Sequence, residues 1–182
     1  MPLDSAVLIR DAREGDASAI AEAERQIAKL PGRLASRPHE LKDEAFREKI
    51  AALSGSETGR YVVVECQGEV VGHAILEPFK LEVTAHAVDL TIAVNEGHQG
   101  QGHGKALLRH LLDWATRNPK IERVMLNVRS SNTAAISLYE KLGFVVEGIR
   151  VKQIKLAPGS YLDNIASKRS PPQAAGSRDG DW

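Results

Sequence analysis

The sequence lacks several features that mark common classes of protein. It has one cysteine, Cys66, among 182 residues, so no disulfide can form within the chain. Its 24 basic side chains balance its 24 acidic ones, so no overall field attracts nucleic acid or an anionic membrane. No apolar run approaches the ~20 residues of a membrane span, and the first residues do not resemble a secretion signal. We therefore expect a cytoplasmic protein with no nucleic-acid or membrane partner.

The length of the chain predicts one domain that is large enough to bury a core of its own. Residues 1–166 carry regular hydrophobic patterns, whereas residues 167–182 contain almost no apolar side chain that could be buried. We expect a single domain over residues 1–166 and a disordered C-terminal tail over residues 167–182.

Strand and helix patterns alternate along the predicted domain. The predicted strands span residues 7–10, 60–66, 69–78, 86–94, 121–128, 144–156 and 161–166. The predicted helices span residues 17–30, 39–53, 104–117 and 133–142, with Asp16 and Asn132 as N-caps and Gly143 at the last C-terminus. This order predicts an α+β fold, with helices on both faces of a mixed, mainly antiparallel sheet of seven strands. The crossover from the fourth strand to the fifth makes those two strands parallel.

A glycine-rich loop joins the fourth strand to the third helix. It contains Gly97, Gly100, Gly102 and Gly104, four glycines within eight residues. Glycine lets a backbone curl tightly and direct several N–H groups at one point, and the helix that follows adds the positive end of its dipole. Strand, glycine loop and helix in this order predict a binding site for a diphosphate.

Two well-known glycine patterns do not fit this loop. The P-loop requires a glycine where the chain has Gln99, and a hydroxyl side chain where it has Ala106. The dinucleotide fingerprint requires a third glycine where the chain has Lys105 or Leu107. Both classes of nucleotide site are therefore excluded at this loop.

A second motif follows the loop at a distance. The loop itself contains Gln99-x-x-Gly102-x-Gly104, and residues 132–144 contain the pattern N-x-x-A-x-x-L-Y-x-x-x-G-F. The two patterns, in this order, resemble the coenzyme-binding motifs of the GCN5-related N-acetyltransferases over residues 86–147. The resemblance implies acetyl transfer from acetyl-coenzyme A (acetyl-CoA) to an amine, with the loop amides holding the pyrophosphate of the coenzyme.

The resemblance also implies where the coenzyme lies. In the family, two parallel strands splay apart, and the pantetheine arm pairs with one of them like an added strand. The residues that this implies for coenzyme binding are Ile92, Ala93, Val94, Gln99, Gly100, Gln101, Gly102, His103, Gly104, Lys105, Asn132, Ala135 and Tyr139.

Tyr139 is the predicted general acid, as the matching tyrosine is in the family. A phenol with a pKa of about 10 is neutral at pH 7 and can donate a proton to the leaving thiolate of the coenzyme. Three residues are candidates for the base that takes a proton from the amine: Asp89, His86 and Glu147. Ribosomal-protein alanine acetyltransferases have a glutamate where this chain has Asn127, and an amide cannot accept that proton.

No metal is expected, because His98, His103 and His110 lack a cysteine or acidic partner at ligand spacing. The leading hypothesis is acetyl transfer to a primary amine of an amino acid or a similar small molecule, by direct attack in a ternary complex. Acetylation of a protein N-terminus is an alternative, and a non-catalytic sensor of acetyl-CoA is another. Members of the family often dimerise, which leaves a homodimer open.

Overall fold

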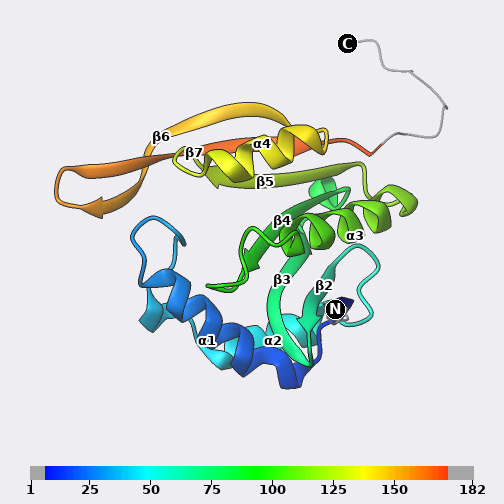
Figure 1. Ribbon diagram of the computed structural model, residues 1–182. Coiled ribbons are helices and arrows are strands. Elements are labelled where there is room, and N and C mark those ends of the chain that lie inside the picture. The colour runs from blue at the N-terminus through cyan, green and yellow to red at the C-terminus, as the bar shows by residue number, and fades with distance from the viewer. Residues whose placement is uncertain (1–6, 172–182) are drawn as a thin grey trace, which may run out of the picture.

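The computed structural model describes residues 7–171, which form one seven-stranded sheet with helices on both faces (Figure 1). The strands are β1 (Val7–Asp11), β2 (Arg60–Cys66), β3 (Glu69–Pro78), β4 (Ala87–Val94), β5 (Arg123–Arg129), β6 (Val145–Ala157) and β7 (Ser160–Arg169). The helices are α1 (Ala17–Ala28), α2 (Asp43–Leu53), α3 (His103–Arg117) and α4 (Thr133–Lys141), with 3-10 turns at Glu14–Asp16, Pro38–Glu40 and Glu82–Thr84. The predicted α+β fold is confirmed.

The sheet has the strand order β1-β2-β3-β4-β5-β7-β6. All neighbouring strands are antiparallel except β4 and β5, which are parallel as predicted. These two strands pair only from Ala87 to Asp89, opposite Arg123 to Met125. Because both strands continue beyond this short ladder, they separate, and the predicted splay is confirmed.

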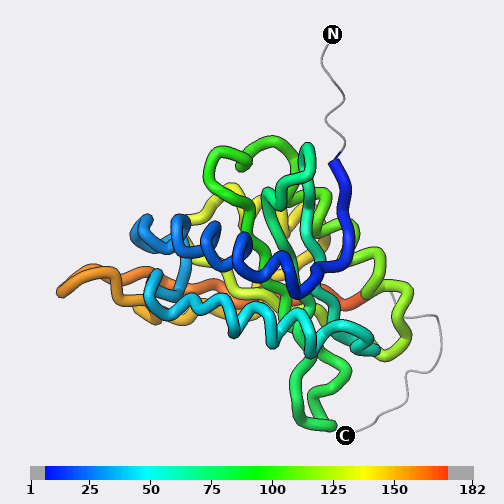
Figure 2. The backbone as a smooth tube through the Cα atoms, turned by 90° about the horizontal axis from the view of Figure 1, so that it is seen from below, coloured from blue at the N-terminus to red at the C-terminus, as the bar shows by residue number. Residues whose placement is uncertain are grey.

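Side chains alternate between the two faces of the sheet and create a core on each. On β2, Val62 and Val64 are buried in the core that includes α3, whereas Tyr61 and Val63 are buried in the core that includes α1 and α2. Helices α1 and α2 lie side by side on that second face, as Figure 2 shows. The apolar stripe of α3 covers the first face with five buried residues, Leu107, Leu108, Leu111, Leu112 and Ala115.

Helix α4 begins and ends as its sequence predicts. The Asn132 Oδ1 atom accepts a hydrogen bond from the Ala135 amide at 3.2 Å, which caps the N-terminus. Gly143 follows the C-terminus in the left-handed region, with φ of 86°. The Phe144 amide then donates to the Tyr139 carbonyl at 3.0 Å, and the Phe144 ring is buried. These contacts fix α4, and with it Tyr139, beside the splayed strands.

One predicted cap and two predicted boundaries are wrong. Asp16 occupies the N-cap position of α1 as predicted, but its side chain does not cap that helix: its carboxylate pairs with Arg10 at 2.8 Å and accepts from the Arg13 amide at 2.7 Å, capping the preceding 3-10 turn instead. The second helix begins at Asp43 rather than at residue 39, because Pro38–Glu40 forms a separate turn. Strand β7 continues through residues 167–169, past its predicted end at residue 166. Residues 172–182 of the predicted tail lie outside the described part.

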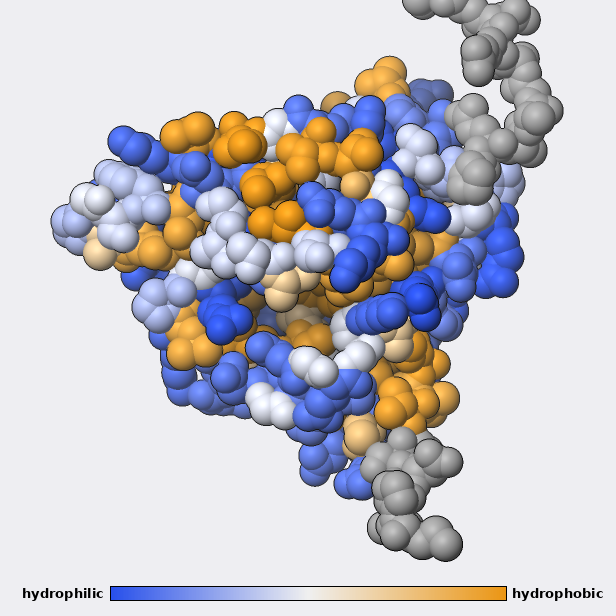
Figure 3. Space-filling model, turned by 45° about the horizontal axis from the view of Figure 1, so that its top comes forward, coloured by the Kyte–Doolittle hydropathy of each residue, from blue (hydrophilic) through white to orange (hydrophobic). Residues whose placement is uncertain are grey.

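The hairpin of β6 and β7 projects beyond the rest of the sheet (Figure 1). Apolar side chains of β6 are exposed, namely Val145, Val146, Ile149 and Val151. Apolar surface gathers on the upper part of the face in Figure 3. Such a surface is compatible with association, but a homodimer remains a prediction. Within residues 7–171, no helix combines the length and the apolar character needed to cross a membrane.

We predict that Leu111→Ala destabilises the domain by about 2–5 kcal/mol, because the fully buried side chain leaves a cavity between α3 and the sheet. The matched control is Arg109→Ala on the exposed side of the same helix, with an expected change within about 0.5 kcal/mol. Urea unfolding followed by circular dichroism measures both. Equal losses for the two variants would contradict the assigned core face of α3.

Candidate functional site

The glycine loop meets α3 in a conformation that glycine favours. Gly97, Gly100 and Gly102 have φ values of 82°, 75° and 90°, all in the left-handed region. Gly102 is the residue immediately before α3, and its carbonyl accepts the Ala106 amide at 3.0 Å. The first turn of α3 therefore follows directly from the loop, and the N–H groups of that turn have no partners within the helix.

Two glutamine side chains brace this loop from within. The Gln99 Nε2 atom donates to the Val94 carbonyl at 3.2 Å, and the Gln101 Nε2 atom donates to the Gly97 carbonyl at 3.0 Å. Both side chains thus hold loop carbonyls, which leaves the backbone amides as donors for an anion. Together with the positive end of the α3 dipole, these amides suit a diphosphate.

A cavity of about 540 Å³ extends from this loop between the splayed strands and α4. All but two of the residues predicted to bind the coenzyme line it. The exceptions are Gln101, which bonds within the loop, and His103, whose side chain is buried at the start of α3. The cavity unites the two sequence motifs, which are about 30 residues apart in the chain.

The edge of β4 that faces this cavity has backbone groups without a strand partner. Pairing with β5 stops at Asp89, whereas β4 continues to Val94. Buried backbone N–H and C=O groups require partners, and a ligand that carries amides in an extended arm would supply them. The pantetheine arm of acetyl-CoA has this chemistry, and the loop amides suit its pyrophosphate. The residues present therefore fit acetyl-CoA.

Tyr139 extends from α4 into the cavity and is half-buried. Its ring contacts Phe144 edge-on, with 5.7 Å between the centroids. Burial raises the pKa of the Tyr139 phenol to about 12, against the opposing effect of the Arg129 guanidinium. The side chain is therefore a neutral hydrogen-bond donor throughout the physiological pH range.

A second cavity of about 300 Å³ adjoins the first, and Tyr139 lines both. Asp89 lines it, and burial, followed by the Glu77 carboxylate, raises the pKa of Asp89. His86 is exposed before the first residue of β4 and does not line this cavity. Glu147 forms ion pairs with Arg123 and Lys168, also outside the cavity. Of the three bases considered from the sequence, Asp89 is the one beside Tyr139.

Asn127 and Arg129 project from β5 into this second cavity. The Asn127 Oδ1 atom accepts from Arg150 at 2.9 Å. Arg129 is half-buried, and its Nε atom is buried without a hydrogen-bond partner among the described residues. Burial lowers the pKa of Arg129, but the guanidinium remains charged at pH 7. The cavity therefore offers a cation to an anionic group of a ligand.

Sequence reasoning missed one acidic residue of this cavity, Glu24 of α1. Its Oε1 atom lies 3.0 Å from Nε2 of His73, and the Tyr61 hydroxyl lies 2.8 Å from Nδ1 of the same ring. The available signal was His73 itself, in the apolar stretch of β3. A polar side chain in a buried strand needs a hydrogen-bond partner, but the sequence does not identify which residue supplies it.

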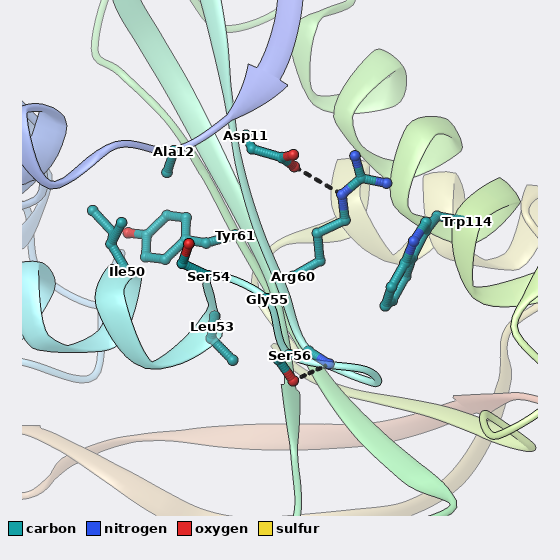
Figure 4. A pocket seen from close by; sticks show the side chains of 11 residues that line it. Asp11, Ala12, Ile50, Leu53, Ser54, Gly55, Ser56, Arg60, Tyr61 and Trp114 are labelled. Carbon is teal, nitrogen blue, oxygen red and sulfur yellow. Dashed lines mark hydrogen bonds and ion pairs between the residues drawn. The ribbon is translucent and has the colours of Figure 1, made fainter.

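Another cavity, of about 310 Å³, lies between α2, β2 and α3 (Figure 4). Arg60 is the cation there; it pairs with Asp11 at 2.8 Å and lies 5.5 Å from the centroid of the Trp114 ring. These charges already satisfy each other, and none of the predicted site residues lines this cavity. It therefore does not contribute to the candidate site.

No group of three or more His, Cys, Asp or Glu residues within the described range is placed to hold a metal ion. That result concerns residues 7–171 alone. The absence of a metal from the reaction therefore remains an expectation from the sequence.

Comparisons with known proteins agree with this geometry. The sequence profile of the acetyltransferase (GNAT) family matches residues 24–144. An L-amino acid N-acetyltransferase of Escherichia coli is 29% identical over 87% of this chain and 94% of its own length. A ribosomal-protein alanine N-acetyltransferase of the same organism is 34% identical over 61% of this chain and 73% of its own.

A solved structure extends the likeness to the whole fold. A protein of Salmonella typhimurium, determined with its cofactor acetyl-CoA, superposes with a TM-score of 0.82 at 24% identity, over 94% of this chain and 97% of that one. The profile match spans both coenzyme motifs up to residue 144. The chain therefore belongs to the acetyltransferase (GNAT) family and is an acetyl-CoA-dependent N-acetyltransferase.

Proposed function

We propose that this protein transfers the acetyl group of acetyl-CoA to the primary amine of an amino acid or a similar small molecule. The observation that carries this proposal is the position of Tyr139, which lines both the coenzyme cavity and the smaller cavity beside it. An amine in the smaller cavity would reach the thioester next to a phenol that can donate to the leaving sulfur.

Direct attack in a ternary complex is supported by the residues around Tyr139. Cys66, at the end of β2, lines neither cavity, so the thiol of this chain is not placed to form an acetyl-enzyme. In direct attack, the amine forms the C–N bond while the C–S bond breaks. Tyr139 donates its proton to the departing sulfur. The nitrogen loses a proton after the attack, and that proton replaces the one that Tyr139 gave up.

An amino-acid-like acceptor is supported by the charges of the smaller cavity. Asp89 and Glu24 are acidic, and Arg129 supplies a half-buried cation. An amino acid carries an ammonium and a carboxylate, which match these two kinds of group. The relative named as an L-amino acid N-acetyltransferase supports the same class of acceptor.

Acetylation of a protein N-terminus is the closest alternative. It is favoured by the relative that acts on ribosomal-protein alanine, and an N-terminal residue presents the same α-amino group. However, Asn127 carries an amide that Arg150 already engages, so it offers no base. A non-catalytic sensor of acetyl-CoA is the remaining alternative, and turnover distinguishes it.

We predict that the protein releases free thiol from acetyl-CoA when an amino acid is added. A panel of amino acids, polyamines and N-terminal peptides, assayed with a thiol reagent, measures the rate for each acceptor. Faster turnover of peptides than of any amino acid would favour the alternative acceptor. Tight binding of acetyl-CoA with no thiol release from any amine would contradict both enzymatic proposals.

We predict that Tyr139→Phe lowers kcat about 100-fold or more, the usual range for a lost general acid, while the Kd for acetyl-CoA changes little. The phenyl ring keeps the contact with Phe144, so the position of α4 is preserved. Steady-state kinetics and calorimetric titration of the coenzyme separate the two effects. A variant that loses coenzyme affinity but keeps its turnover would restrict Tyr139 to packing.

We predict that Gly102→Ala weakens acetyl-CoA binding about 5- to 30-fold, because a Cβ atom disfavours the left-handed conformation by about 1–2 kcal/mol. No atom lies within 4 Å of the added methyl group, so the effect is conformational. Gly55→Ala is the matched control, since Gly55 has φ of 78° in equally open space outside the coenzyme cavity. Titration should show weaker binding for Gly102→Ala alone.

A further inference from the structure

Three polar side chains connect the acceptor cavity to the interior of the sheet. His73 projects from β3 toward α1, with its side chain 3% exposed, and Glu24 of α1 is 12% exposed. The Glu24 Oε1 atom lies 3.0 Å from Nε2 of His73, and the Tyr61 hydroxyl lies 2.8 Å from Nδ1. The Tyr61 and His73 rings also stack, with 5.6 Å between their centroids. The geometry holds all three side chains in one chain of contacts.

The Tyr61 hydroxyl determines which atom donates in the hydrogen bond between Tyr61 and His73. Burial, with the nearby Glu24 and Asp16 carboxylates, raises the pKa of Tyr61 well above its usual range, so its hydroxyl keeps its proton. The hydroxyl therefore donates to Nδ1 of His73, at 2.8 Å. The separation of 3.0 Å between Nε2 and the Glu24 Oε1 atom is a close contact rather than an aligned hydrogen bond, and it places the carboxylate against the buried ring.

Glu24 lies where two acceptor-side cavities meet. It lines the cavity that contains Tyr139, and it also lines a neighbouring cavity of about 230 Å³ with Phe46 and Thr91. His73 and Tyr61 line neither of these. Glu24 is therefore the member of the chain of contacts that an acceptor in these cavities can touch.

We propose that Glu24 is the catalytic base for the acceptor amine and that His73 and Tyr61 are positioning residues that hold its carboxylate. This inference rests on the proposed function. In this step the acceptor ammonium gives one proton to the Glu24 carboxylate, which becomes a carboxylic acid, and the neutral amine attacks the thioester. After the acetyl group has been transferred, Glu24 releases that proton to solvent, and the net reaction liberates one proton for each amide formed.

Asp89 lines the same cavity but is less well prepared for this role. It stands directly opposite Glu77 across the β3–β4 ladder, and no hydrogen bond orients its carboxylate within the described part of the chain. The charged groups around it are Glu77, Lys49 and Arg150. Glu24, by contrast, lies against a buried ring, with its Oε1 atom 3.0 Å from Nε2 of His73. A base that must meet one proton in one direction benefits from such fixed geometry.

The test compares Glu24→Gln with the wild-type protein on an amine that the wild type acetylates. Glutamine keeps the shape and the contact with the His73 ring, but it cannot take the proton. We expect kcat/KM to fall about 100-fold or more for an acceptor that is charged at the assay pH. For a fluorinated analogue whose amine is already neutral at that pH, we expect the loss to shrink to a few-fold.

Two further variants control for position and structure. Glu22→Gln changes an exposed carboxylate on the same helix and should retain wild-type kinetics. Tyr61→Phe removes only the hydroxyl that holds the ring and should lower kcat by an intermediate factor while leaving the KM for acetyl-CoA unchanged. Coenzyme affinity and thermal unfolding, measured for each variant, identify any general loss of structure.

The outcomes separate this inference from the proposed function. A wild-type protein that acetylates no amine overturns the proposed function before any variant is compared. An active wild type matched by Glu24→Gln overturns the role of Glu24. The same holds if Asp89→Asn, rather than Glu24→Gln, shows the loss that disappears with the neutral amine. A Glu24→Gln variant that is equally slow on charged and neutral amines also overturns it.

Discussion

The early end of the β4–β5 ladder is the constraint on which the site depends. Each of these strands has a full antiparallel neighbour on its other side, β3 for β4 and β7 for β5, so both remain stable after they separate at Asp89. The separation exposes backbone donors and acceptors that no other strand reaches. Since such groups require partners, the gap between the separated strands β4 and β5, which we call the wedge, suits a ligand with amides in an extended arm. The coenzyme site is therefore largely a backbone site.

The alternation of side chains along β4 assigns the two faces of the sheet to different tasks. Leu90 and Ile92 pack into the core with α3, the helix whose N-terminus suits a diphosphate. Asp89 and Thr91 point to the other face, where α1 and α2 border the acceptor-side cavities. Tyr139 reaches the same place from α4. The proposed coenzyme cavity and the proposed acceptor cavity thus meet at Ile92 and Tyr139, which line both, and this arrangement suits direct transfer between the two substrates.

Local patterns explain how much of this structure could be predicted from the sequence. The hairpin of β2 and β3, the N-cap at Asn132 and the turn at Gly143 depend on neighbouring residues, and each was predicted at its observed position. The start of α2 was misplaced because the helix predicted from residue 39 included the end of a separate 3-10 turn, Pro38–Glu40. Asp16 was misassigned because its partner, Arg10, is defined by the path of the chain rather than by helix signals.

The contact between Glu24 and His73 also depends on the path of the chain rather than on local signals, because it joins a helix and a strand 49 residues apart in the sequence. Burying an ionisable carboxylate, an imidazole and a phenol together is costly compared with an apolar core, and such groups persist where the surrounding structure holds them. His73 faces the same core as Val63 and Ile75, where an aliphatic side chain would pack without any such cost. The polar alternative has one structural consequence that an aliphatic residue lacks: it places a polar contact behind a carboxylate that lines the same cavity as Tyr139. The proposed acid and the proposed base would then act within one cavity, where a bound amine can meet both.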